Sequence, residues 1–328
     1  MRKVEFIYLS QEDVVGLEIP MGRVIELVEG GLSEHGHGRV ENPPKPGIHS
    51  KSDAFIHAMP AYYGGLGIGG LKWVSGYPSN RAVGLPQIAG LMVVNDMETG
   101  MPLAVMDCRW ITAVRTAAVS SITARHCARE GASSLGVVGC GVQGRMSLVA
   151  FKEVIPGLEE VSVFDINPDA MRAYKSDFER ELGVEITIAG DVEEAVCGRD
   201  MILTATQRLE EPLVRDEWFG AGCLGFGLEA SRAWFGDAIL GADKFVTDSW
   251  DQTVHFHEQG AFPDGLPTLY AELGEIVAGL KPGRESPDER ILAINIGLAL
   301  EDVIVADHIY QMAKDGEYQK LTLMKEDF

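Results

Sequence analysis

The sequence is short of cysteine, of basic residues and of long apolar runs. Its five cysteines lie singly without a CxxC pair, which argues against a disulfide framework and a clustered zinc site. Only 28 Lys and Arg residues accompany 49 Asp and Glu residues, and the net charge of −21 disfavours nucleic acid and anionic membrane surfaces as partners. The N-terminus has no apolar signal segment, and the apolar stretch 291–300 is too short to cross a membrane. We therefore expect a cytoplasmic protein.

What is present is a globular composition, with 46% hydrophobic and 23% charged residues. A chain of 328 residues predicts two domains, because a single core rarely grows to that size. A capping box at Ser10–Asp13 and Pro20 predict two helices near the N-terminus, and the proline-rich stretch 36–52 predicts a loop. Runs rich in β-forming residues then predict strands at 54–63, 68–74, 88–95 and 102–107, followed by a helix at 112–129.

From Ser134 onward, short apolar strands alternate with helical segments. The predicted helices include 145–155 and 169–182, and the predicted strands are 135–138, 161–164, 184–188, 201–205, 223–226 and 244–247. Such an alternation predicts a parallel sheet that is covered on both faces. A last helix at 298–314 lies beyond the alternation and can return to the first domain.

A GxGxxG motif, Gly139-Cys-Gly141-Val-Gln-Gly144, directly follows the first of these strands and precedes a helix. Gly139 suits the tight turn, Gly141 lets a pyrophosphate approach the backbone, and Gly144 allows close packing of helix and strand. The context matters, because 65–70 also matches GxGxxG but no helical run follows it. We interpret 65–70 as a Gly-rich strand or turn, and 139–144 as a dinucleotide-binding loop.

Asp165 ends the second strand of this unit, about 20 residues after the motif. A carboxylate at this position accepts hydrogen bonds from ribose hydroxyls and repels a 2′-phosphate. The sequence therefore predicts NAD as the cofactor, in preference to NADP.

Motifs outside this unit resemble the ornithine cyclodeaminase/μ-crystallin family. They lie in the family's order along nearly the whole chain, and the late ones include 271–279 and 297–302; the others are Lys72-Trp-Val-Ser-Gly-Tyr-Pro78-Ser-Asn80, Gly84-Leu-Pro86, Arg115-Thr-Ala-Ala118 and Gly139-Cys-Gly141-Val-Gln143. The resemblance implies an α/β fold, with a Rossmann-type parallel-sheet domain at 128–299 and a second, α+β domain at 1–127 and 300–328. The second domain would bind substrate and form a homodimer.

The resemblance also implies a cationic clamp for the carboxylate of an amino acid or imino acid. Lys72 and Arg115 match the family's lysine and arginine, and Lys45 stands where relatives usually have arginine. Two or more cations fix a carboxylate and hold the neighbouring carbon in place. An ordinary lysine at the end of a strand is the alternative reading of Lys72. We expect Lys72→Ala to remove turnover while leaving cofactor affinity and folding nearly intact.

Glu229 is the second candidate for a catalytic role, beside Lys72. Cyclodeaminases of the family carry Gly-Gly-Asp-Cys-Pro-Gly after the fifth Rossmann strand, whereas this chain has Gly225-Phe-Gly-Leu-Glu229-Ala-Ser-Arg. With a one-residue gap Glu229 takes the place of the Asp, but a solvated loop carboxylate is an equal reading. The departure argues against ornithine cyclodeamination itself.

The residues predicted to bind the dinucleotide come from the motif, from Asp165 and from two flanking segments: Thr116, Gly139, Gly141, Val142, Gln143, Asp165, Thr204 and Thr206. No metal is expected, because the histidine pairs at 35/37 and 255/257 lack the spacing of a helical zinc pair. Asp248 follows a strand, and either borders the nicotinamide pocket or only ends that strand.

These residues predict an NAD(H)-dependent oxidoreductase that acts on the C–N bond of an amino acid or its imine, with Glu229 or Lys72 exchanging the nitrogen proton. Two alternatives stay open. One is an ornithine cyclodeaminase-type ammonia-lyase that regenerates NAD in each turnover. The other is a non-catalytic, μ-crystallin-like binding protein.

Overall fold

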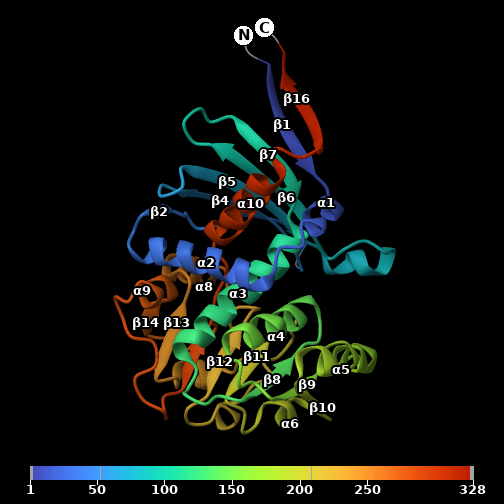
Figure 1. Ribbon diagram of the computed structural model, residues 1–328. Coiled ribbons are helices and arrows are strands. Elements are labelled where there is room, and N and C mark those ends of the chain that lie inside the picture. The colour runs from blue at the N-terminus through green and yellow to red at the C-terminus, as the bar shows by residue number, and fades with distance from the viewer. Residues whose placement is uncertain (1–2, 52, 208, 326–328) are drawn as a thin grey trace. The chain divides into compact units, whose positions relative to one another are not determined.

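The computed structural model describes residues 3–51, 53–207 and 209–325, which form two compact units (Figure 1). Unit 1 comprises Met1–Arg115 and Leu298–Phe328, and unit 2 comprises Thr116–Gly297. The units divide at 115/116 and 297/298, whereas the sequence analysis placed the domain borders at 127/128 and 299/300. The first division falls inside helix α3 (Arg109–Cys127), where no loop or change of composition marks it.

Unit 2 contains an eight-stranded sheet in the order β10-β9-β8-β11-β12-β15-β13-β14, and all its registered pairs are parallel. The strands are β8 Ser134–Val138, β9 Glu160–Phe164, β10 Glu185–Ile188, β11 Met201–Thr204, β12 Leu224–Gly227, β13 Lys244–Thr247, β14 Leu269–Glu272 and β15 Ile291–Ala293. The first six are the six strands predicted from the sequence. The parallel sheet and the α/β class are therefore confirmed.

Strands β14 and β15, with four and three residues, were not predicted, because so short a run shows no recognisable β period in the sequence. The helical segments of unit 2 between its strands are α4 Val142–Val154, α5 Pro168–Leu182, α6 Val192–Val196, η2 Asp216–Trp218, α7 Gly236–Leu240, α8 Trp250–Glu258 and α9 Leu273–Val277. All five residues of β8 are buried, as expected for a strand covered on both faces.

Unit 1 contains a second eight-stranded sheet, in the order β16-β1-β7-β6-β5-β4-β2 with β3 paired to β4. Every registered pair is antiparallel except β1 with β7. The strands are β1 Val4–Leu9, β2 Val40–Glu41, β3 Gly47–Lys51, β4 Ala54–Tyr63, β5 Ile68–Gly76, β6 Ile88–Asp96, β7 Pro102–Asp107 and β16 Gln319–Met324. The helices are α1 Gln11–Gly16, α2 Met21–Gly36, η1 Pro78–Val83 and α10 Ala299–Ala313.

The four predicted β runs of unit 1 are confirmed as β4 to β7, and the predicted capping box at Ser10 and Asp13 is present. The prediction of a loop at 36–52 was wrong in part, because β2 and β3 lie within it. Both strands pair along β4. The prolines between them interrupt the β pattern in the sequence, yet they are tolerated because these strands are short and peripheral.

Helix α10 packs on strands β4 to β7 and against α2 (Figure 1). Gly70, the last glycine of the second GxGxxG match, lets α10 lie close to the sheet. A Cβ at this position would lie 3.2 Å from Val303 on α10 and 2.5 Å from the carbonyl oxygen of Val93. The region 64–67 is a turn that leads into β5, as the sequence predicted. Among the described helices, none has both the length and the apolarity needed to cross a membrane.

Candidate functional site

The loop between β8 and α4 is shaped by its three motif glycines. Gly139 has φ +108°, and a Cβ there would lie 2.5 Å from the carbonyl oxygen of Ala205 on the neighbouring chain segment. A Cβ on Gly144 would lie 2.1 Å from the carbonyl oxygen of Gly139, so helix and loop touch at this point. Around Gly141, by contrast, none of the described atoms lies within 4 Å of a Cβ position. The fold requires two glycines, and the third leaves its backbone open to a ligand.

Helix α4 begins directly after this open position. Gly141 is its N-cap residue, and no side chain from the described chain caps it. Val142 and Gln143 open the helix, and the side chain of Val142 is 62% exposed. The first N–H groups of a helix have no partner within the helix and attract anions, so this end fits a pyrophosphate.

Asp165 follows β9 and is fastened to the same loop. Its Oδ2 accepts a hydrogen bond from the N–H of Cys140 at 2.8 Å, and its Oδ1 accepts one from the N–H of Asn167 at 2.8 Å. A carboxylate has about four acceptor positions, so two protein donors leave room for ribose hydroxyls. The half-buried position of Asp165 next to the Gly-rich loop fits the ribose of a dinucleotide.

Glu229 lies after β12, with both of its carboxylate oxygens engaged by the end of β11. The Thr204 hydroxyl donates to Oε1 at 2.5 Å, and the N–H of Thr206 donates to Oε2 at 3.1 Å. The indole N–H of Trp234 donates to Thr204 Oγ1 at 3.1 Å, and the carbonyl oxygen of Phe226, also 3.1 Å from Oγ1, offers the hydroxyl a second acceptor. Burial raises the pKa of Glu229 to about 7, against the opposing effect of these hydrogen bonds. A carboxyl with this pKa can take up and release a proton near neutrality.

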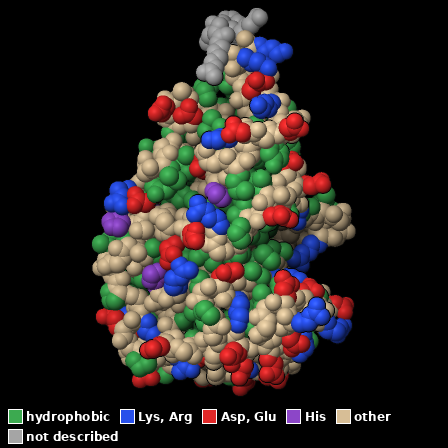
Figure 2. All heavy atoms as spheres, in the orientation of Figure 1, with side chains coloured by type: hydrophobic (Ala, Val, Ile, Leu, Met, Phe, Trp, Pro, Cys, Tyr) green, Lys and Arg blue, Asp and Glu red, His purple; other side chains and the backbone are tan. Residues whose placement is uncertain are grey.

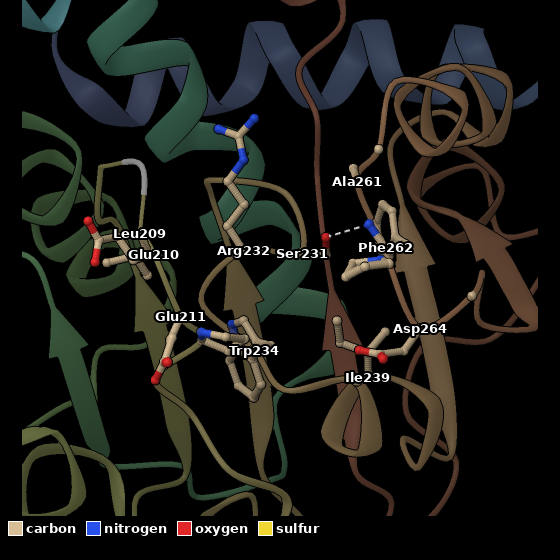
Figure 3. Close-up of a pocket in the computed structure, with 15 residues that line it drawn as sticks. Leu209, Glu210, Glu211, Ser231, Arg232, Trp234, Ile239, Ala261, Phe262 and Asp264 are labelled. Carbon is tan, nitrogen blue, oxygen red and sulfur yellow. Dashed lines mark hydrogen bonds between the residues drawn. The ribbon is translucent and has the colours of Figure 1, made fainter. Parts of the chain in front are cut away.

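A pocket of about 280 Å³ lies beside this network in unit 2 (Figure 3). Trp234 forms part of the pocket wall. Its indole N–H donates to Thr204, which in turn donates to Glu229, so the pocket and the carboxylate share this hydrogen-bond network. Ser231 Oγ accepts a hydrogen bond from the N–H of Phe262 across it at 2.8 Å. Phe262 has φ +52° and Ala230, next to Ser231, has φ +61°, so the backbone around the pocket is strained at two non-glycine residues.

In unit 1, Lys72 and Arg115 meet in a buried cluster with two acids from the first turn of α10. Lys72 Nζ donates to Asp302 Oδ2 at 2.6 Å, and Arg115 Nη1 donates to Glu301 Oε2 at 2.6 Å. Arg115 Nε also lies 3.2 Å from Asp302 Oδ1. The side chains of both acids are fully buried, and those of Lys72 and Arg115 are 1% and 9% exposed. The cluster is therefore formally neutral.

Lys45 is also buried, in the segment between β2 and β3. The next residue, Pro46, accepts a backbone hydrogen bond from Ala58 on β4, and the following residue of β4, Met59, faces Lys72 on β5. The backbones of Lys45 and Lys72 are thus at the same level of the sheet, about 10 Å apart given two strand spacings.

The family model described as ornithine cyclodeaminase/mu-crystallin matches residues 6–317. The chain belongs to this family. Alanine dehydrogenase from Archaeoglobus fulgidus is 34% identical over 318 residues, which cover 94% of this chain and 96% of that protein. A structure of Thermococcus litoralis Δ1-pyrroline-2-carboxylate reductase in complex with NADH and L-proline has a TM-score of 0.85 at 33% identity, covering 94% of this chain and 98% of that one. An archaeal alanine dehydrogenase dimer with bound NAD has a TM-score of 0.86 at 32% identity, covering 98% and 100%.

Membership of the ornithine cyclodeaminase/mu-crystallin family confirms the resemblance inferred from the motifs. The structure brings the predicted residues together in two groups, one in each unit. Unit 1 holds the residues predicted to form the clamp, and unit 2 holds those predicted to bind the dinucleotide, with Glu229. Within unit 2, the loop 139–143 and Asp165 share the ends of β8 and β9, while Thr204, Thr206 and Glu229 lie at the ends of β11 and β12. Thr116 is the first residue of unit 2, in α3.

Sequence reasoning gave no role to Glu301, Asp302 or Trp234. Consecutive acids followed by the apolar run of α10 were the available signal, because carboxylates that enter a buried helix need partners. Asp248, in contrast, is accounted for without a ligand. Its two oxygens accept hydrogen bonds from the N–H groups of Ile296 and Gly297, at 2.9 and 2.5 Å, so it fixes the chain after β15.

Proposed function

We propose that this protein is an NAD(H)-dependent oxidoreductase acting on the C–N bond of an amino acid or its imine. The buried cluster of Lys72 and Arg115 carries this proposal, because a binding site for an apolar ligand has little need of paired cations. The alanine dehydrogenase and the pyrroline-carboxylate reductase, both related at more than 30% identity, support this reaction class.

In this proposal the residues of unit 2 hold the cofactor. The N–H groups of Val142 and Gln143 and the open backbone of Gly141 receive the pyrophosphate, and Asp165 accepts hydrogen bonds from the ribose. Gly139 shapes the loop, while Thr116, Thr204 and Thr206 complete the cofactor-binding set. When bound, NAD supplies the hydride acceptor, and NADH the hydride donor.

The substrate is held by cations of unit 1. Lys72 and Arg115 bind its carboxylate and offset the charge, and Lys45 assists. Arginine makes a planar two-pronged contact that lysine cannot, so Lys45 gives a looser contact than the family's usual arginine. Glu229 or Lys72 exchanges the proton on the substrate nitrogen, a general acid–base role. The pKa of Glu229, about 7, suits that exchange.

The experiment that tests the proposal is a spectrophotometric screen of the purified protein. Amino acids are mixed with NAD, and 2-oxo acids with ammonia or methylamine are mixed with NADH. A substrate-dependent change in NADH absorbance is expected. Ammonia release from ornithine without net NADH change would instead support the cyclodeaminase alternative, which the replacement of the family's Asp-Cys-Pro-Gly segment argues against. Tight cofactor binding without turnover of any substrate would support the binding protein.

We also propose a homodimer. The related alanine dehydrogenase structure is a dimer, and unit 1 exposes apolar side chains on the sheet face opposite to α10. Trp73 and Leu91 are direct cross-strand neighbours there, 43% and 44% exposed. Exposed aromatic and aliphatic side chains that lie together on a sheet are typical of an interface between copies.

A further inference from the structure

Lys72 lies in apolar surroundings, on the sheet face that α10 covers. Its cross-strand neighbours are Met59 on β4 and Met92 on β6, both buried. An ammonium group in such a row loses its water, and the loss must be compensated by a charged or polar partner. The partner that contacts it is Asp302, 230 residues further along the chain.

Asp302 contacts two cations at once, through its two carboxylate oxygens. Oδ2 accepts from Lys72 Nζ at 2.6 Å, and Oδ1 lies 3.2 Å from Arg115 Nε. It thus bridges a lysine from β5 and an arginine from α3, while Glu301 contacts the other side of the guanidinium. A buried ion network is seldom the most stable solution, since well-packed apolar residues of similar volume are often as good or better. The network therefore calls for a role other than stability.

The charges around Lys72 indicate that role. Burial lowers the pKa of Lys72, and the neighbouring Arg115 lowers it further, whereas Asp302 raises it. The Cys108 thiol also acts on Lys72, and burial raises the pKa of that thiol to about 11, while Glu301 of the same cluster is paired with Arg115. On balance the pKa of Lys72 is lowered, and without Asp302 it would be lower still. A neutral amine cannot offset the charge of a carboxylate.

We infer that Asp302 is the positioning residue of the cation clamp: it supplies the charge partner of Lys72 and holds Lys72 and Arg115 in one fixed arrangement. Its link to catalysis rests on the proposed function, but its effect on Lys72 does not. A substrate carboxylate then meets two oriented cations whose charges are already balanced. Binding selectivity comes from their geometry more than from net attraction.

The test is a pH titration of Lys72 by NMR, on full-length protein with 13C-labelled lysine side chains, the signal being assigned through Lys72→Arg. Asp302→Asn is expected to lower the pKa of Lys72 by about one unit or more, as for the loss of an opposite charge within contact distance. The matched control is Asp307→Asn, which removes a buried carboxylate of the same helix that hydrogen-bonds Gln311. It should leave the Lys72 titration unchanged.

An unchanged titration in Asp302→Asn, or an equal change in Asp307→Asn, would overturn the inference. If Asp302→Asn does not fold, Asp302→Glu keeps the charge but displaces it by one methylene. The Lys72 titration should then stay near that of the wild type, while the simultaneous contact of this carboxylate with Lys72 and Arg115 is disturbed and kcat/KM falls at least tenfold. Wild-type values of both in Asp302→Glu would overturn the positioning role.

A second titration separates this inference from the proposed function. Acetate added to the wild type should shift the Lys72 signal if Lys72 binds carboxylates. Absence of that shift counts against the clamp and not against the effect of Asp302 on the pKa of Lys72. Once a substrate is known, the basic limb of its kcat/KM profile should move to lower pH in Asp302→Asn by the same amount as the NMR titration.

Discussion

Lys72 is 1% exposed and paired with Asp302, so removing its amine also leaves a carboxylate buried without its main partner. The sequence-based expectation that Lys72→Ala leaves folding nearly intact is therefore revised. We now expect it to lower the free energy of unfolding by about 3–5 kcal/mol, measured by urea denaturation. Lys72→Ala with Asp302→Ala should recover part of that loss. Arg23→Ala is the control, because its ion pair with Glu26 is exposed and should contribute less than about 1 kcal/mol.

Glu229 gives a pH dependence to the proposed reaction. With its pKa of about 7, the ionised form, which is the proton acceptor in amino-acid oxidation, is half populated near pH 7 and predominates above it. The kcat/KM for oxidation should rise with pH through about 7, and that for imine reduction should fall. In Glu229→Gln the change of kcat/KM around pH 7 should disappear, and kcat/KM should fall by roughly 10²–10⁴-fold. An unchanged pH profile in this variant would mean that another group exchanges the proton. Glu185→Gln, which changes an exposed carboxylate, serves as the control.

The same residue affects stability with the opposite sign to a salt-bridged carboxylate. The pKa of Glu229 is higher in the folded protein than its ordinary value of 4.5, so the folded state binds the proton more tightly than the unfolded state. Its contribution to stability is complete below about pH 4.5 and is lost as the pH rises towards 7. Glu229→Gln should therefore gain stability relative to the wild type across that window, measured by urea denaturation at each pH.

Asp165 determines the choice of cofactor in our proposal. A 2′-phosphate beside its carboxylate should weaken NADPH binding by roughly 1–3 kcal/mol relative to NADH. Dissociation constants for both nucleotides, measured by fluorescence titration, check this directly. Tighter binding of NADPH than of NADH would contradict it.

At the scale of elements, the β8–loop–α4 segment separates what glycine does for folding from what it does for a ligand. Gly144→Ala places a Cβ 2.1 Å from a carbonyl oxygen and should destabilise the protein by about 1–3 kcal/mol. Gly141→Ala meets none of the described atoms within 4 Å, so its stability should equal that of the wild type. Its affinity for NADH should nevertheless fall at least tenfold, since the methyl group occupies the approach of the pyrophosphate. Urea denaturation and NADH titration of both variants test the pair.

Helix α10 shows how an element can combine two roles. From Val303 onward it supplies apolar side chains to the core of unit 1, and Gly70 on β5 allows it to lie close to the sheet. Its first turn carries Glu301 and Asp302, which reach Arg115 and Lys72. The distance between α10 and the sheet therefore determines where the carboxylates of Glu301 and Asp302 lie. A change in its packing, for example at Gly70, should disturb the clamp.

At the scale of the whole molecule, the net charge of −21 is spread out. Figure 2 shows acidic side chains over the visible face, with basic ones between them. Such a surface keeps copies apart unless an apolar area brings them together. Trp73 and Leu91 are the side chains to change, on the sheet face opposite to α10.

We expect the wild type to sediment as a dimer and Trp73→Glu with Leu91→Glu to sediment as a monomer. Two carboxylates at the centre of an apolar interface would be desolvated without partners. Leu280→Glu, at a 57% exposed apolar side chain in unit 2, should remain dimeric. A wild-type monomer at micromolar concentration would contradict the proposed assembly.

The sequence by itself determined the Rossmann-type unit and the loop that we propose binds the dinucleotide. The strand periodicity, the glycines at 139, 141 and 144, and Asp165 lie within one short stretch of chain, and each follows from local rules of backbone geometry and charge. The same local rules missed β14 and β15, whose few residues carry no period, and β2 and β3, which prolines separate.

Only the tertiary structure decided the state of the clamp. Lys72 and Arg115 were found through motifs, but motifs did not reveal that Asp302 and Glu301 neutralise them from 230 and 186 residues away. The pKa of Glu229 likewise depends on Thr204, Thr206 and burial by packed neighbours. Electrostatic effects depend on distance in space and on the exclusion of water, and a one-dimensional pattern records neither.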